Sequence, residues 1–563
     1  MLEERSETRS GLAGVALLLI AVWGVGMAAG PLAADGGPRV SADVRVNAPQ
    51  QLFPNDNPTR STTTIAASSD GQNLLVGFED FQGVCGPPLG LACPPPSPPG
   101  VVGFSFSTDG GRSWTDGGAP FPIGATITQG HPWADRLAAH GDDDHGDDGE
   151  NGHDGDHDTY FLSTVLQNAT TSRILGLGVY RGHFGAGTFA FDNAKTIFPA
   201  NAGDLYTRAA LAAAKDGHPD AYVALVNIDE ICGVPFAGFG QIEVFRTHDG
   251  GATWAGPAVV SPETAAILDP NDPQCGNQGF LQVAPAVAIG PHGEVYVVWQ
   301  YGPEFLLNGT ITATDSIAFS RSVDGGQTFS APALIAGLND MRANPPVGLG
   351  QNRMNDQPRL AVATSGAHRG RIYVTMFPAV SPVAVAATAQ SVVSSQAYLI
   401  FSDDLGATWS APSALAPPVP PTGVKRLWPT VSVRPGGAVD VVYLESQEVA
   451  TGTRCSVPIG PVAKRTGPAS SLVDTFWVQS RDGGSSFGPP VRVSSQTSNW
   501  CTAPYRFATS LLANFGFYIG STSVGDRTFA VWPDDGSGGP IDVLFATIQG
   551  HQEGDEHDDS HGH

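Results

Sequence analysis

The chain has 563 residues, 41% of them hydrophobic, and a formal net charge of −25. This charge argues against nucleic acid as a partner, because phosphate binding requires a basic surface. Part of the charge is local, since residues 140–158 hold nine acids and residues 551–563 hold five. The hydrophobic content is ample for one large buried core.

The N-terminus combines a short polar head with an apolar run over residues 12–29. We interpret residues 1–35 as a secretory signal, although Glu3, Glu4 and Glu7 make the head less positive than such signals usually are. Left uncleaved, the run is long enough to act as a membrane anchor. The sequence thus predicts a secreted or extracytoplasmic protein.

An eight-residue pattern occurs five times along the rest of the chain. It reads Ser/Thr, any residue, Asp, any residue, Gly, any residue, Ser/Thr, then Trp or Phe, and its acids are Asp109, Asp249, Asp324, Asp404 and Asp482. Asp accepts hydrogen bonds from nearby backbone N–H groups and Gly supplies a positive φ, so the pattern indicates a β-hairpin turn. We interpret the five acids as structural, with metal binding or catalysis as the alternative.

This pattern resembles the Asp-box (BNR) repeat of sialidase-like β-propellers, and the resemblance covers roughly residues 40–548. A fixed period marks an array of one supersecondary unit. The acids are 140, 75, 80 and 78 residues apart, so the doubled first gap predicts one repeat without a box, at about 131–198.

Alternating apolar segments between the boxes predict an all-β fold, a single β-propeller of four-stranded blades over residues 36–550. We count seven blades, with six as the alternative. The last repeat shows three strands, so residues 40–46 are expected to add its missing outer strand and close the ring.

Strand parity then sorts the connections by face. The boxes and the insertion at 140–158 share one face, and the long loops share the other, where we expect a functional site. Exported proteins form disulfides, and the loop positions make three pairs reasonable: Cys85–Cys93, Cys232–Cys275 and Cys455–Cys501.

The resemblance implies a site with three arginines holding a sugar carboxylate, a Tyr–Glu nucleophile pair and an Asp acid/base. The family's Arg-Ile-Pro signature is absent, and Pro58-Thr59-Arg60-Ser61 stands where it would be expected. Arginines recur at or just before inner strands, and the weak catalytic candidates are Arg60, Arg136, Arg208, Arg359, Tyr443, Glu445, Tyr518 and Asp535. Arg426 belongs to the same group of arginines, and Asp534 stands beside Asp535 as a second possible acid. The alternative is that each arginine pairs with an acid for structure.

Two other groups of residues could bind ligands. Trp133, Trp299, Trp428 and Trp532 could stack on sugar rings or close the blade cores. The low-complexity segments 140–158 and 551–563 are expected to be disordered, and loose divalent-metal binding is expected at His140, His145, His153, Asp154, Asp156, His157 and Asp158. A solvating acidic linker is the alternative, and no cofactor is required.

The sequence therefore predicts an exported, sialidase-like propeller, monomeric, that hydrolyses or binds glycans. The alternative is a non-catalytic extracellular scaffold for protein partners, with accessory metal-binding His/Asp strips. Membrane contact is expected only through an uncleaved N-terminal segment.

Overall fold

The structure is a computed structural model, and it describes residues 37–49, 59–80, 101–139, 158–168, 174–199, 204–229, 240–262, 280–303, 306–307, 310–311, 314–341, 344–349, 357–383, 385–386, 392–449, 470–502, 515–536 and 539–550. Residues 38–551 form one compact unit. Within the described ranges, no helix is long and apolar enough to cross a membrane. The apolar run at 12–29 lies outside them.

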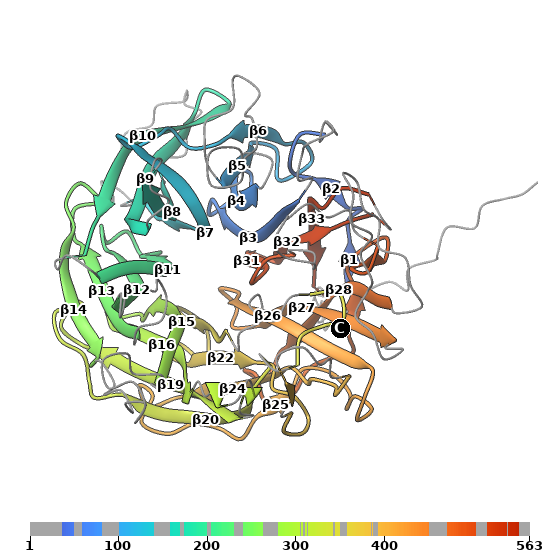
Figure 1. Cartoon of the computed structure of the whole chain (residues 1–563). Helices are drawn as coiled ribbons and strands as arrows, with labels where there is room; N and C mark the ends of the chain where they lie inside the picture. The colour runs from blue at the N-terminus through green and yellow to red at the C-terminus, as the bar shows by residue number, and fades with distance from the viewer. Residues whose placement is uncertain are drawn as a thin grey trace, which may run out of the picture. The chain divides into compact units, whose positions relative to one another are not determined.

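Seven antiparallel sheets, the blades, surround a common centre (Figure 1). The inner to outer strands of blades one to three are β3 (Arg60–Ala67), β4 (Leu74–Asp80), β5 (Val102–Ser107) and β6 (Thr115–Gly118); β7 (Thr126–Leu137), β8 (Thr159–Asn168), β9 (Ile174–Gly185) and β10 (Thr188–Ile197); β11 (Asp204–Ala213), β12 (Ala221–Asp229), β13 (Gly240–Thr247) and β14 (Ala255–Ser261).

The remaining blades follow the same order. They are β15 (Phe280–Ile289), β16 (Val295–Pro303), β19 (Thr314–Ser322) and β20 (Ala333–Asn339); β21 (Arg359–Val362), β22 (Ile372–Met376), β24 (Tyr398–Ser402) and β25 (Ser413–Ala414); β26 (Val424–Val433), β27 (Val439–Val449), β28 (Ser470–Ser480) and β29 (Val491–Arg492), with β30 (Ser498–Asn499) also on β28; β31 (Gly520–Val524), β32 (Arg527–Asp534) and β33 (Asp542–Gln549). The predicted seven-bladed all-β propeller is confirmed.

The N-terminal segment closes the ring, as predicted. β1 (Arg39–Val40) and β2 (Val44–Arg45) both pair with β33, so the last blade takes its outer strand from the other end of the chain. This pairing covers an edge that would otherwise present unpaired backbone groups.

Each Asp box forms the turn between the third and fourth strands of its blade. In the fourth blade, Asp324 accepts hydrogen bonds from Ser322 Oγ (2.7 Å), Thr328 N (2.9 Å) and Thr328 Oγ1 (2.6 Å). The other four boxes repeat these bonds. Hydrogen bonds from Thr253 hold the pKa of Asp249 down at about 2. The box acids are therefore used to build the turn.

The boxes also join neighbouring blades. In the fifth blade, Gly406 has φ +83° and approaches so near that an added Cβ would lie 2.2 Å from the Phe319 ring of the fourth blade. The remaining four boxes each have two glycines. An added Cβ at the second of these would crowd a side chain of the preceding blade: Gly111 with Phe545, Gly251 with Phe161, Gly326 with Tyr222 and Gly484 with Leu399. Arg321 of the fourth blade donates to the Leu405 carbonyl (2.6 Å). The preceding blade thus holds this box through both a ring contact and a hydrogen bond.

The second blade has no box, and a tight β9–β10 hairpin at Gly185–Thr188 takes its place. Aromatic rings bridge the first and second blades there, with Phe104 4.8 Å from Phe191 and Phe106 6.2 Å from Phe184 between centroids. An aromatic contact has therefore replaced the glycine contact.

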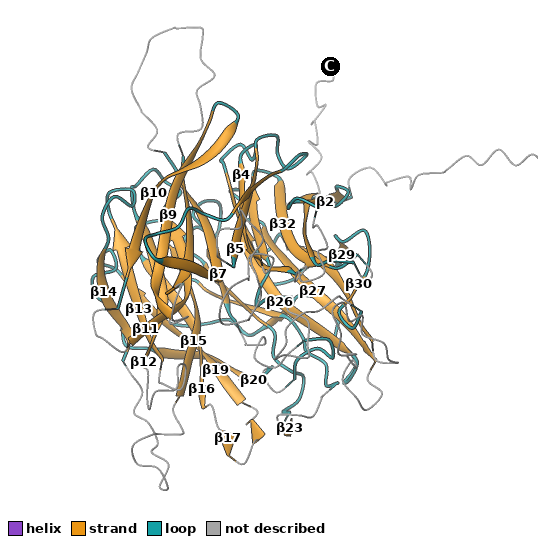
Figure 2. Ribbon diagram, turned by 45° about the horizontal axis from the view of Figure 1, so that its top comes forward, coloured by secondary structure: helices purple, strands orange, loops and turns teal. Residues whose placement is uncertain are grey.

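The first-to-second-strand turns lie beside the boxes, since Gly110 N donates to Gln72 O (2.9 Å) and Gly250 N to Pro219 O (3.0 Å). We call this end of the blades the box face. A small sheet of β17 (Leu306–Leu307), β18 (Thr310–Ile311) and β23 (Val385–Ala386) belongs to connections of the opposite end, where β17 and β23 are drawn at the bottom of Figure 2.

Candidate functional site in the central channel

The inner strands share an irregularity at one level of the ring. Five of them contain a β-bulge, and its first residue has a left-handed backbone although it is not glycine: Thr62, His131, Arg208, Ala284 and Trp428, with φ between +49° and +55°. Such residues are uncommon, cost free energy and cluster at functional sites. This level of the channel is therefore the first place to look for a site.

Three large side chains meet at the level just past the bulges. Trp133 follows the bulge of β7, Arg359 opens β21, and Tyr518 precedes β31. The Arg359 Cζ lies 4.4 Å from the Trp133 ring centroid and 4.3 Å from that of Tyr518, and the two rings are 5.5 Å apart. We call these three residues the floor.

Arg359 is a buried cation without an acidic partner among the described residues. The residue is 7% exposed, and within the described ranges its Nη2 has no hydrogen-bond partner. Burial lowers the pKa of the guanidinium to about 10, with the Tyr518 phenol opposing that shift. The aromatic rings supply cation–π attraction but accept none of the guanidinium hydrogen bonds. The guanidinium therefore keeps unused hydrogen-bonding capacity at the floor.

A cavity of about 630 Å³ begins at the floor and is lined by residues of all seven inner strands. Its wall has two halves. Leu211, Ala213, Val287 and Ile289 of β11 and β15 form an apolar half, whereas Thr430, Ser432, Ser521 and Ser523 of β26 and β31 form a hydroxyl half. The cavity can therefore receive a ligand with one apolar and one polar side.

The other end of the cavity is charged and lies at the box face. Lys215 binds Asp135 and the Arg136 carbonyl, and its side chain is 38% exposed. Asp216 and Arg369 also line this end and are exposed. We call this end the mouth.

Tyr518 stands in an environment that keeps its phenol neutral. It is 5% exposed, and its hydroxyl donates to the Pro132 carbonyl. Burial raises the pKa of Tyr518 far above its usual value; the Arg359 charge opposes this, and the Glu79 charge adds to it. A phenol in this state is a poor nucleophile.

Glu79 was missed by the sequence reasoning. It is the penultimate residue of β4 in the first blade, is 2% exposed, and accepts hydrogen bonds from Thr62 Oγ1 (2.8 Å) and His131 N (3.2 Å). Its carboxylate therefore holds the bulges of β3 and β7 in place next to the floor. The signal available in the sequence was an acid near the end of β4, the second strand of its blade, which is apolar up to that point.

Four of the other arginines at inner strands do not reach the floor. Arg60 pairs with Asp80 (3.1 Å), Arg136 with Asp158 (2.6 Å) and Arg426 with Glu445 (2.9 Å). Arg208 lies with its Cζ 5.7 Å from the ring centroid of Phe517, and His131 packs on the same ring at 4.7 Å. The structure thus brings only Arg359 of this set to the cavity floor, while Arg136 lines the mouth.

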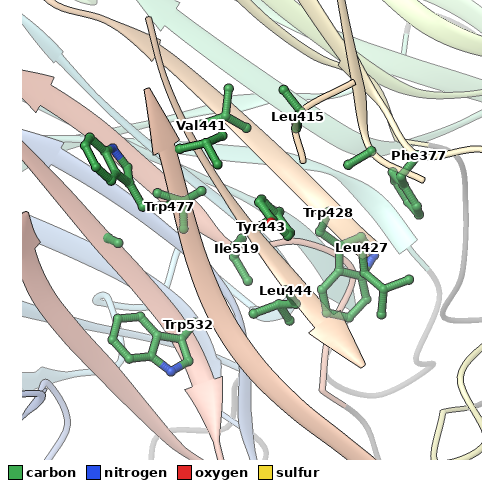
Figure 3. Packing of buried hydrophobic residues seen from close by; sticks show 14 of the residues in the cluster. Phe377, Leu415, Leu427, Trp428, Val441, Tyr443, Leu444, Trp477, Ile519 and Trp532 are labelled. Carbon is green, nitrogen blue, oxygen red and sulfur yellow. The ribbon is translucent and has the colours of Figure 1, made fainter. Parts of the chain in front are cut away.

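The remaining candidates lie elsewhere. Tyr443 is fully buried beside Trp428 and Ile519 in the hydrophobic core (Figure 3). Asp535 accepts from Ser498 Oγ (2.5 Å) and Asn499 N (3.0 Å), which fixes a loop of the sixth blade. Of the four tryptophans considered as sugar-stacking candidates, Trp133 lines the cavity, and Trp299, Trp428 and Trp532 lie in the blade cores.

Most of the expected metal ligands lie outside the described residues, namely His140, His145, His153, Asp154, Asp156 and His157. Asp158 is described, and it accepts from Arg136 Nη1 and from Ala139 N (2.9 Å). Of the cysteines only Cys501 is described; it is buried and disulfide-bonded. The three predicted pairings stay predictions.

The comparisons with known proteins return structural neighbours only. No family model matches the sequence, and no curated protein is a significant match. The structure is similar to a GH93 α-L-arabinofuranosidase of Fusarium graminearum, solved with arabinobiose (TM-score 0.43, 13% identity, 91% of this chain and 98% of that chain). It is also similar to the endosialidase of phage phi92 (0.41, 9%, 94% and 71%) and to the Trypanosoma rangeli sialidase (0.33, 10%, 69% and 51%). The activities in these names are those of the neighbouring proteins.

Proposed function

We propose that this chain is an exported, glycan-directed propeller that binds the carboxylate of an acidic sugar at Arg359. The observation that carries the proposal is the buried guanidinium at the cavity floor, with no acid beside it among the described residues. Burying an unpaired charge is costly, and an anionic ligand removes that cost by forming charge-assisted hydrogen bonds.

The surroundings of Arg359 favour a sugar acid over a bare anion. Trp133 and Tyr518 present aromatic rings next to the guanidinium, and the hydroxyl half of the wall offers Thr430, Ser432 and Ser521. Aromatic rings pack on the apolar face of a sugar while hydroxyl groups bond to its edge.

The described residues support binding better than hydrolysis. Glycoside hydrolysis usually needs two carboxyl groups flanking the scissile bond. In the described lining, the carboxylates are Asp135 and Asp216, both at the mouth, and Lys215 neutralises the first. Tyr518 is at the floor, but its phenol is kept neutral. We therefore place recognition ahead of turnover.

The test is calorimetric binding of N-acetylneuraminic acid, glucuronic acid and neutral galactose to the wild type and to Arg359→Met. Met keeps much of the side-chain volume and removes the charge. Hydrogen bonds to charged groups contribute about 1.5–3 kcal/mol, so affinity for the acids should fall about 10- to 150-fold. Arg492→Met, which removes a half-exposed arginine paired with Asp474, is the matched control for net charge. Equal binding of acids by wild type and Arg359→Met would refute the proposal.

A fluorogenic sialoside assay on the same proteins separates binding from catalysis. No turnover with intact acid binding is the expected result. Turnover that is lost in Arg359→Met would make the protein a glycosidase that uses the same floor.

A further inference from the structure

We infer that the acidic ligand enters the channel from the box face, carboxylate first, as a single unbranched chain end; this inference rests on the proposed function. The expectation from the loop lengths was a site on the opposite face. The cavity that ends at Arg359 instead runs toward the first-to-second-strand turns at the box face.

Exposure along the cavity gives its direction. Arg359 and Tyr518 at one end are 7% and 5% exposed. The residues that line the other end are exposed and stand in or beside the first-to-second-strand turns: Ser69, Asp216, Arg369, Pro435 and Gly525. The opening within the described part of the chain is therefore at the box face, and the floor is its inner end.

The dimensions restrict the shape of the ligand. Along the seventh blade the wall runs from Tyr518 to Val524, which at 3.3 Å per residue is a depth of about 20 Å. A volume of about 630 Å³ over that depth makes the cavity a channel. A linear chain end can lie along such a channel, whereas a branch point would be held at the mouth.

The chemistry of the wall fixes the orientation of the ligand. The carboxylate must travel to the floor, where the unsatisfied Nη2 of Arg359 lies. The hydroxyl half comes from adjacent strands, with Ser432 and Ser523 hydroxyls 2.7 Å apart, and the opposite half is apolar. A sugar chain lying along the channel can meet both halves, because its rings have apolar faces and polar edges.

The test blocks the mouth from outside. Ser69→Cys is purified, and binding of the methyl α-glycoside of N-acetylneuraminic acid is measured before and after reaction with a bulky maleimide. Ser69 lines the mouth and is exposed. The control is Val323→Cys, because Val323 is 71% exposed in a box of the same face and does not line the cavity. The unlabelled Ser69→Cys protein reports whether the substitution itself disturbs the fold.

The expected result is a loss of at least about tenfold in affinity for labelled Ser69→Cys and no change for labelled Val323→Cys. Unchanged binding by labelled Ser69→Cys, together with lost binding in Arg359→Met, would show entry from the other face and overturn this inference while leaving the proposed function intact. Binding that survives in Arg359→Met would overturn both.

Discussion

The contact between each box and the preceding blade makes a quantitative prediction for Gly406→Ala. Two costs add at this position. A residue with a Cβ in the left-handed region costs about 1–2 kcal/mol, and Gly406 has φ +83°. The new Cβ would also lie 2.2 Å from the Phe319 ring, and overpacking of this kind costs about 1–3 kcal/mol. The free energy of unfolding should fall by about 2–5 kcal/mol in all.

Two other glycines separate these costs. Gly293 has φ +81° with open space around it, so Gly293→Ala should show the backbone cost alone. Gly436 lies outside the left-handed region and an added Cβ there would meet open space, so Gly436→Ala should be close to neutral. Urea unfolding followed by tryptophan fluorescence gives all three values. A loss for Gly406→Ala no larger than that for Gly293→Ala would refute the idea that the box glycine is packed against the neighbouring blade.

Three further predictions concern charge. Burial raises the pKa of Asp534 to about 7 from 3.8. Between these values the folded state keeps a proton that the unfolded state loses. The free energy of unfolding should therefore fall by at most about 4 kcal/mol as the pH rises from about 4 to 7. Asp534→Asn should reduce the difference between urea midpoints at about pH 5 and about pH 8, and an unchanged difference would contradict this cause. Arg321→Met should lose about 1–2 kcal/mol of stability, because Arg321 donates to the next box, whereas Met at the exposed Arg112 should not. Deleting residues 140–157 and 551–563 should remove weak Zn²⁺ binding measured by equilibrium dialysis, and equal binding after deletion would place any metal elsewhere.

The architecture was predictable because it is repeated. Five boxes at a fixed period gave the repeat, the recurring apolar segments gave the count of seven blades, and the doubled gap located the blade without a box. The incomplete last repeat pointed to residues 40–46 for ring closure. Each of these signals is local in the sequence and recurs, so one physical interpretation of the turn could be applied at every copy.

The floor was harder to predict because similar arginines have dissimilar partners. Arg136 and Arg359 both stand at inner strands. Asp158, which directly precedes the neighbouring strand β8, neutralises the first, and none of the described acids neutralises the second. That difference depends on which side chains the fold brings together. The segments His131-Pro132-Trp133 and Gln357-Pro358-Arg359 share an X-Pro-X pattern and both end on a floor residue. Two other inner strands carry the same pattern at Ala284-Pro285-Ala286 and Trp428-Pro429-Thr430, so the pattern alone does not single out the floor.

The closing blade also has a consequence for how the molecule is made. Arg39 pairs with Gln549, so the contact that completes the ring joins residues about as far apart in the chain as the described segment allows. Contacts of such long sequence separation form late and slowly, because loop-closure entropy must be overcome first. During synthesis the N-terminal strands emerge long before β33 exists to receive them. The outer edge of the last blade therefore remains incomplete until the whole propeller has been made, and a chain that stops before β33 cannot complete that blade.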